Sequence, residues 1–302
     1  MDESGLFDIF AKHPSLTGKS LRDLSGLDEL TLWRLCRRSD RIILKTAGRR
    51  YLRLDRQVEG YARLSPSIKR EFLTYTICGL MENREAVSLH ALDLERSTQK
   101  ISREKEEFAR RTLEKIIASS PLRDAVLEGV CVIIAGDIVY DMAHLEPRPE
   151  SSTGRLVRGS DLDVIIVTAD GFPEEIRSHL DEIIYREKYL CIIKPDIREE
   201  IDYIIKDLKK VRSQLRFDRF EHMVASKILD EGHLIGGNPD IFRRVQKMLD
   251  KGGIPEKIKA LTDEAVANRR EAEAILLGGE GKLSEEESFK LFYTKEEAEE
   301  IF

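Results

Sequence analysis

The chain has 302 residues and a formal net charge of −6, with 41% apolar and 35% charged residues. It is long enough to bury a sizeable core, and no apolar run approaches the roughly 18 residues that a membrane span needs. Its first residues are acidic and lack the basic and apolar regions of a secretion signal. The four cysteines lie far apart without a C-x-x-C pair, so we expect neither a zinc site nor a disulfide framework, and we predict a cytoplasmic protein without a membrane partner.

Charge is distributed unevenly along the chain. Residues 12–64 carry 13 Lys and Arg against 6 Asp and Glu, a local excess of +7, and the rest of the chain is acidic. Residues 15–38 contain two short helical patterns. Residues 42–54 then give two β-prone runs separated by Ala47-Gly48, which predicts a basic hairpin.

This order of helix, turn, helix and hairpin resembles a winged helix-turn-helix over about residues 10–60, and we assign residues 1–64 to that domain. The resemblance implies that the second helix enters the major groove of a duplex and that basic side chains contact its phosphates. Leu32 and Trp33 alternate with the arginines and are predicted to be core. An alternative interpretation is a protein docking or dimerisation unit with solvated arginines. The predicted nucleic-acid-binding residues are Arg34, Arg37, Arg38, Arg49 and Arg50.

The rest of the chain alternates between strand and helix patterns. Ser65-Pro66 is typical of a helix start, and we predict a helical linker over residues 65–104. Buried strands are predicted over residues 130–137, 162–168 and 199–207, with an amphipathic helix after Pro173. These patterns predict an α+β or α/β domain over residues 105–250, in which helices flank a mixed sheet, followed by C-terminal helices over residues 251–302.

Two aspartates stand one residue apart where the second strand begins. Because side chains alternate along a strand, Asp161 and Asp163 point the same way, with Cα atoms about 6.6 Å apart. Two carboxylates this close repel each other unless a cation lies between them. A pair of divalent ions about 3.5 to 4 Å apart would remove the repulsion and form a centre for phosphoryl displacement. Asp202, on the third strand, is positioned to add a third carboxylate.

The full string consists of a strand ending at Gly136, the Gly159-Ser160 pair, the Asp-apolar-Asp motif and a later strand with Asp202. It resembles the nucleotidyltransferase superfamily that includes DNA polymerase beta, over roughly residues 105–250. The resemblance implies attack by a hydroxyl of the acceptor on the α-phosphorus of a nucleoside triphosphate. It implies that Mg²⁺ or Mn²⁺ is bound by Asp161, Asp163 and Asp202, and that Asp202 is also the catalytic base. The nucleotide-binding residues that it implies are Gly136, Asp137, Gly159 and Ser160.

Two departures from the family pattern leave alternatives open. Asp137 stands where the family has Ser or Gly, and the spacer between Gly136 and Asp161 is long. One alternative is that phosphate binding has moved to residues 151–154, "SSTG", with Arg155 or Arg158 adding positive charge. Another is a DNA-binding regulator whose transferase-like domain is catalytically inactive. The sequence leaves the acceptor and the preferred base open, and an oligomer is compatible with it.

Overall fold

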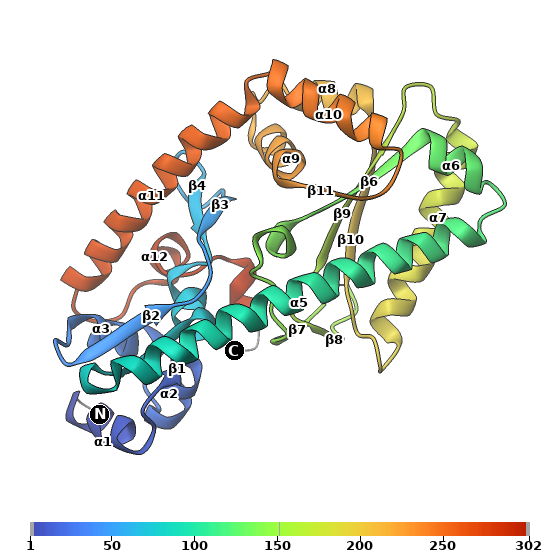
Figure 1. The fold of residues 1–302 in the computed structure, drawn as a ribbon. Coiled ribbons are helices and arrows are strands. Elements are labelled where there is room, and N and C mark those ends of the chain that lie inside the picture. The colour runs from blue at the N-terminus through green and yellow to red at the C-terminus, as the bar shows by residue number, and fades with distance from the viewer. Residues whose placement is uncertain (1–2, 151, 300–302) are drawn as a thin grey trace. The chain divides into compact units, whose positions relative to one another are not determined.

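The computed structural model describes residues 3–150 and 152–299. The chain forms two compact units, an N-terminal unit of residues 3–98 and 261–299 and a central unit of residues 99–260 (Figure 1). Helices α5 (Arg84–Ser119) and α11 (Ile254–Gly278) each begin in one unit and end in the other. Residues 65–98 and 261–299 therefore belong with the N-terminal unit, whereas the sequence suggested a separate linker and a separate C-terminal region.

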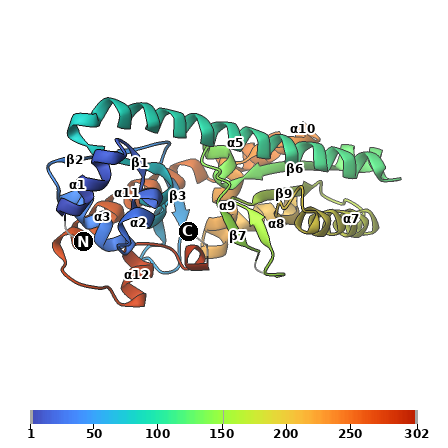
Figure 2. The same ribbon diagram turned by 90° about the horizontal axis from the view of Figure 1, so that it is seen from below.

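Three helices and a three-stranded antiparallel sheet form the first part of the N-terminal unit (Figure 2). The helices are α1 (Glu3–Lys12), α2 (Gly18–Ser25) and α3 (Glu29–Arg38), and the strands, in sheet order, are β1 (Leu16–Thr17), β5 (Thr76–Leu80) and β2 (Ile42–Thr46). The side chains of Thr17 and Asp28 accept hydrogen bonds from backbone N–H groups at the starts of α2 and α3. The two helices predicted within residues 15–38 are thus confirmed.

The predicted hairpin around Ala47-Gly48 is wrong. Strand β2 pairs with β5, and β3 (Tyr51–Leu54) pairs instead with β4 (Ala62–Ser65). The long helix predicted from Ser65 is also wrong, because only α4 (Ile68–Arg70) and the π-helix η1 (Glu71–Tyr75) precede β5. All residues of β5 are buried. A continuous buried apolar run does not distinguish a strand from a helix by its periodicity.

Residues from both sequence segments of the N-terminal unit, 3–98 and 261–299, pack in one core. Leu32 and Trp33 are 0% and 5% exposed, which confirms the prediction that both are core residues. The Trp33 ring meets Phe292 edge to face, with centroids 6.3 Å apart. Three short elements complete this unit, η2 (Met81–Asn83), α12 (Glu285–Leu291) and η4 (Glu296–Glu299). Helix α12 begins with the capping box that Ser284 and Glu287 predict.

A four-stranded mixed sheet forms the centre of the central unit. Its strands, in sheet order, are β10 (Ile201–Asp207), β9 (Leu162–Thr168), β6 (Val130–Ala135) and β11 (His233–Gly237). Strands β9 and β10 are parallel, and β6 runs antiparallel to both β9 and β11. The three predicted strands are therefore confirmed, and the structure adds β11.

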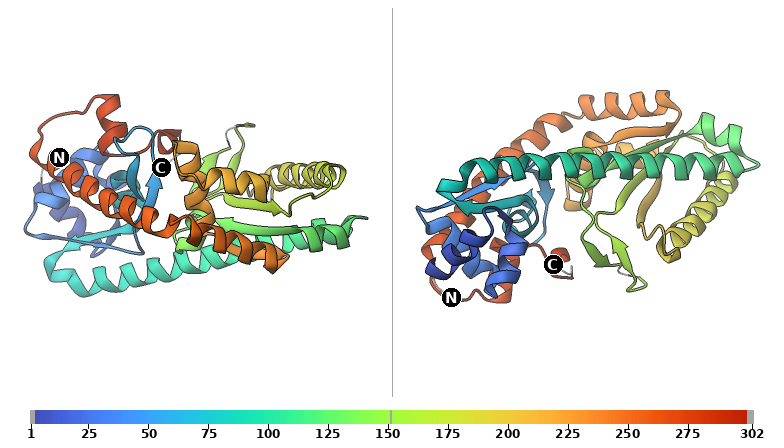
Figure 3. Two further views of the ribbon diagram at one scale, coloured as in Figure 1. Left: turned by 90° about the horizontal axis from the view of Figure 1, so that it is seen from above. Right: turned by 60° about the horizontal axis from the view of Figure 1, so that its bottom comes forward.

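Helices cover both faces of this sheet (Figure 3). One face packs against α5, α6 (Arg123–Gly129) and α7 (Glu174–Ile193), and the other against α8 (Leu208–Gln214), α9 (Phe220–Glu231) and α10 (Pro239–Lys251). The long spacer after Gly136 contains the 3-10 helix η3 (Gly136–Tyr140) and a hairpin of β7 (Pro147–Pro149) and β8 (Leu156–Arg158). None of the helices within the described ranges is long and apolar enough to cross a membrane.

Candidate active site

Two strands, β9 and β10, bring the predicted carboxylates to one end of the sheet. Asp163 on β9 lies directly opposite Asp202 on β10, and its neighbour on the other side is Ala135, the last residue of β6. Asp161 immediately precedes β9. Because paired residues of neighbouring strands point to the same face, Asp163 and Asp202 lie side by side. The structure thus brings Asp161, Asp163 and Asp202 together.

Asp163 is the electrostatic centre of the site. Burial raises the pKa of its carboxyl well above the usual range, and the negative charges of neighbouring carboxyl groups raise it further. These neighbours are Asp161, Asp137, Asp202 and Glu231. Five acidic side chains therefore share one region, and their mutual repulsion opposes ionisation of Asp163.

Gly136 allows Asp163 to occupy this position. It follows β6 with a φ of +74°, and a Cβ atom added to it would lie 2.1 Å from Oδ2 of Asp163. Any larger residue at this position would therefore displace the carboxylate and would be strained in its backbone. Phosphate binding by Gly136 stays a prediction, and the structure adds a steric role beside Asp163.

The Glu231 carboxylate accepts a hydrogen bond from the backbone N–H of Gly136, the residue that the sequence predicts to bind phosphate. The Gly136 N–H donates to Oε1 of Glu231 over 3.3 Å, and the Tyr140 hydroxyl donates to Oε2 over 2.5 Å. Lys227 forms an ion pair with the same carboxylate at 2.5 Å. Sequence reasoning missed the role of Glu231. An anion at this amide competes directly with phosphate for the same donor.

Asp137 and Ser160, both predicted to bind nucleotide, contact each other. The Ser160 hydroxyl donates to Oδ2 of Asp137 over 3.0 Å and accepts from the His144 N–H over 3.2 Å. Gly159 packs closely against the His144 carbonyl, where an added Cβ would lie 1.8 Å from the oxygen. These contacts join the turn after β6 to the residues that precede Asp161.

Two cations that the sequence did not single out bind the backbone before Asp161. Lys105 on α5 is 3% exposed, and its ammonium donates to the carbonyls of Arg158 and Ser160 over 2.7 and 2.8 Å. Arg148 on β7 donates from Nε to the Gly159 carbonyl over 2.9 Å. Burial lowers the pKa of Lys105, and the nearby Glu199 opposes that shift. The partners are far away in sequence, so no local pattern indicates these bonds.

The alternative phosphate site at residues 151–154 has its donors engaged. The N–H and hydroxyl groups of Ser152 and Thr153 all donate to the carboxylate of Glu150, at distances of 2.6 to 3.0 Å. Burial favours the neutral acid, but these bonds outweigh it and lower the pKa of Glu150 to about 2. Ser151 lies outside the described residues. A carboxylate therefore occupies the position proposed for phosphate.

The donor set at the sheet end suits a hard divalent ion. Carboxylate oxygens are the ligands that Mg²⁺ and Mn²⁺ prefer, and five carboxyl groups meet there. No three acidic, histidine or cysteine side chains in the described part of the chain already stand as ligands around a common point. Instead, Arg148 approaches Asp161 and Lys188 approaches Asp202, each at 3.6 Å. Metal binding would replace these weak, partly exposed ion pairs.

Most of the predicted nucleic-acid-binding arginines contact their own unit. Arg34 is 8% exposed and donates to the carbonyls of Leu276 and Gly281, each over 2.7 Å. Arg38 donates to the carbonyls of Leu277 and Gly279. The C-terminal end of α11 and the residues after it thus receive bonds from the predicted recognition helix α3.

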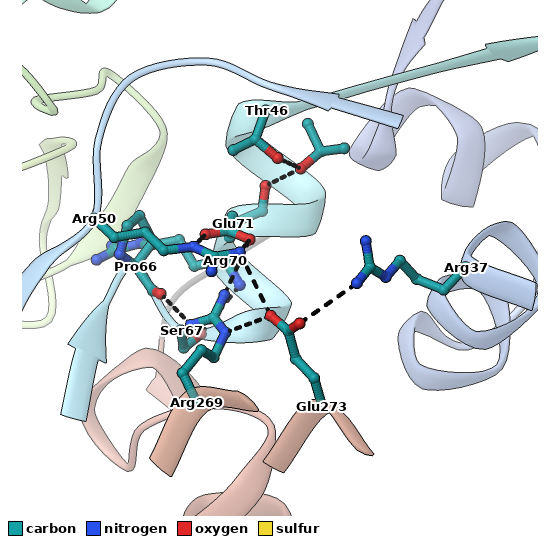
Figure 4. Close-up of polar contacts among 10 residues, drawn as sticks. Arg37, Thr46, Arg50, Pro66, Ser67, Arg70, Glu71, Arg269 and Glu273 are labelled. Atoms are coloured by element: carbon teal, nitrogen blue, oxygen red, sulfur yellow. Dashed lines mark hydrogen bonds and ion pairs between the residues drawn. The ribbon is translucent and has the colours of Figure 1, made fainter. Parts of the chain in front are cut away.

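Arg37 and Arg50, each with a side chain that is 42% exposed, contact an ionic network around the buried Glu71 and Arg269 (Figure 4). Arg50 binds Glu71 through two nitrogens, at 2.5 and 2.7 Å. Arg269, which is 6% exposed, pairs with both Glu71 and Glu273, and Arg37 reaches Glu273 at 3.4 Å. Arg49 is exposed. Arg34 is therefore a buried structural residue, whereas the other four predicted arginines remain exposed.

Replacing Arg34 with methionine tests this structural role. We expect Arg34→Met to lower the free energy of unfolding by about 2 to 3 kcal/mol, because the buried Leu276 carbonyl and the Gly281 carbonyl lose a charged donor. Arg49→Met, on the exposed surface, is the matched control and is expected to change it by less than about 0.5 kcal/mol. Urea denaturation measures both. Equal effects of the two substitutions would contradict the assignment.

Comparison of the chain with known protein families and with curated proteins gives no match. Its functional interpretation therefore rests on the geometry of the carboxylate cluster and of the residues around it.

Proposed function

We propose that the protein is a cytoplasmic, metal-dependent nucleotidyltransferase of the DNA polymerase beta type, which transfers a nucleoside monophosphate from a nucleoside triphosphate to a hydroxyl acceptor. The observation that carries the proposal is the direct pairing of Asp163 with Asp202 on neighbouring strands, with Asp161 immediately before the strand that carries Asp163. The raised pKa of Asp163 supports it, because a site that concentrates negative charge favours a bound cation.

Each carboxylate has a role in this proposal. Asp161 and Asp163 would hold Mg²⁺ or Mn²⁺, which would supply charge stabilisation at the phosphates. Asp202, whose side chain is 64% exposed, is accessible to an acceptor and would accept the proton of its hydroxyl. Gly136, which has no Cβ atom, would leave the space that the carboxylate of Asp163 needs. The hydrogen bond between Ser160 and Asp137 would fix the loop that carries the first ligand.

A catalytically inactive regulator is the second candidate function. The observation that favours it is the hydrogen bond from the Gly136 N–H to Glu231, since this carboxylate takes the donor that a triphosphate would need. Asp137 adds a further negative charge beside this turn. In this case the central unit would sense a ligand or mediate assembly without turnover.

The order of elements in the N-terminal unit and its sheet order β1-β5-β2 support a winged-helix assignment for that unit. The engagement of Arg34, Arg37 and Arg38 within the unit favours a docking role over reading of a DNA groove. Nucleic acid remains a candidate partner through exposed positions such as Arg49.

Transfer of label tests the proposed function. The purified protein is incubated with Mg²⁺ or Mn²⁺, each α-labelled nucleoside triphosphate in turn, and total cellular RNA, DNA and protein. We expect label in one fraction, and none with Asp163→Asn, because that variant lacks the buried ligand. If no fraction is labelled while nucleotide binding is still measurable, the inactive regulator is the better account.

A further inference from the structure

Three consecutive carbonyl groups before Asp161 accept hydrogen bonds from two side chains. Lys105 bonds to the carbonyls of Arg158 and Ser160, and Arg148 bonds to the carbonyl of Gly159 between them. The loop therefore has a fixed backbone at the point where the first proposed metal ligand begins. Neither cation comes from the sheet, because Lys105 lies on α5 and Arg148 on the hairpin strand β7.

Each cation is in turn held by one of two adjacent glutamates. Glu199 accepts from Lys105 over 2.5 Å, and Glu200 forms an ion pair with Arg148 at 2.8 Å. These two glutamates stand just before β10, the strand that carries Asp202. The two pairs thus connect the backbone beside Asp161 with the start of the strand that supplies the third carboxylate.

The hydrogen-bonding capacity of Lys105 is fully used. An ammonium group has three donor hydrogens, and Lys105 has three oxygen partners between 2.5 and 2.8 Å. Its side chain is 3% exposed, and that of Arg148 is 17% exposed. A buried, fully bonded cation restricts its partners far more than an exposed ion pair does. The Lys105–Glu199 pair is neutral overall, so its main effect on the site is orientation, whereas Arg148 also contacts the Asp161 carboxylate itself at 3.6 Å.

We infer that Lys105 and Arg148, with Glu199 and Glu200, are positioning residues that set the orientation of Asp161 relative to Asp163 and Asp202 and thereby the affinity of the site for a divalent ion. This inference rests on the proposed function, since it concerns the same carboxylates. Residues that orient metal ligands typically change metal affinity or activity by about 10- to 100-fold when they are replaced.

Binding of Mn²⁺ to the full-length protein tests the inference without relying on turnover. Free Mn²⁺ is measured by electron paramagnetic resonance in titrations of the wild type, Arg148→Gln and the double variant Lys105→Met with Glu199→Gln. The double variant removes both charges of its pair, so no buried ion is left unpaired. Lys100→Met is the matched control, because Lys100 lies on the same helix with a side chain that is 76% exposed.

We expect both positioning variants to bind Mn²⁺ about 10- to 100-fold more weakly than the wild type. The thermal midpoint should be unchanged for Lys100→Met and lowered for Arg148→Gln, which leaves the buried Glu200 without its cation. If the double variant does not fold, Arg148→Gln decides alone. Wild-type Mn²⁺ affinity in the positioning variants, together with its loss in Asp163→Asn, would overturn the inference and leave the proposed function standing. Absence of Mn²⁺ binding in the wild type would contradict both.

Discussion

Asp163→Asn is expected to abolish nucleotidyl transfer and at the same time to stabilise the metal-free protein. Loss of a ligand to the catalytic ions should lower the rate by about 1,000-fold or more, because such ions supply several kcal/mol of charge stabilisation. In the absence of metal, asparagine removes a partly buried carboxyl group that four neighbouring acids disfavour as an anion. Asp163→Asn thus separates the contribution of Asp163 to catalysis from its cost to the stability of the metal-free protein.

The raised pKa of Asp163 makes the free energy of unfolding depend on pH. The pKa of Asp163 is raised in the folded state, so the native protein binds more protons than the unfolded chain above about pH 4, the usual pKa of an aspartate. The contribution of Asp163 to stability is therefore complete below that pH and is lost as the pH rises through the folded-state pKa. Asparagine has no such loss.

Urea denaturation in the presence of a chelator measures this difference. At pH 8 we expect Asp163→Asn to exceed the wild type by about 1 kcal/mol or more, since one pKa unit corresponds to about 1.4 kcal/mol. Asp202→Asn is the control, because the Asp202 side chain is 64% exposed and its charge is solvated. A destabilised Asp163→Asn protein at pH 8 would contradict the account of a repelling cluster.

Gly136→Ala is expected to lower the stability of the protein and to disturb the carboxylate cluster. The new methyl group would lie 2.1 Å from Oδ2 of Asp163, so either the carboxylate or the turn after β6 must move. We expect a decrease of about 3 kcal/mol or more in the free energy of unfolding, together with loss of Mn²⁺ binding.

Gly171→Ala provides the matched control for this substitution. Gly171 has a φ of +76°, almost the same as the +74° of Gly136, but its added Cβ would meet no atom within 4 Å. It therefore carries only the backbone strain of a left-handed residue, about 1 to 2 kcal/mol. The difference between the two variants isolates the clash with Asp163. Equal losses of stability would show that the carboxylate does not depend on Gly136.

The strands and the alignment of carboxylates could be predicted from the sequence because both follow from local periodicity. Alternation along the strand predicts that Asp161 and Asp163 lie near each other, and the Asp161 charge does act on Asp163, although Asp161 lies just before β9. The apolar runs identify β6, β9 and β10. The pairing of Asp163 with Asp202 needed only that β9 and β10 be neighbours in register.

Contacts between distant segments could not be predicted in this way. The residues that follow Gly48 look like the second strand of a hairpin, yet β2 pairs with β5 because all five residues of β5 are buried in the sheet. The arginines of α3 look like a basic surface, yet Arg34 bonds to residues more than 240 positions away. The contacts of Lys105 were equally unpredictable, since nothing near it in sequence distinguishes it from an exposed lysine of α5 such as Lys100.

The most direct measurement of the central proposal is an anomalous scattering map from crystals grown with Mn²⁺ and a nucleoside triphosphate analogue that resists cleavage at the α-phosphorus. We expect Mn²⁺ peaks bound by Asp161, Asp163 and Asp202, with the triphosphate beside them and Glu231 displaced from the Gly136 amide. A map with nucleotide bound elsewhere, or with no Mn²⁺ at these three carboxylates, would contradict the assignment of this sheet end as the site of nucleotidyl transfer.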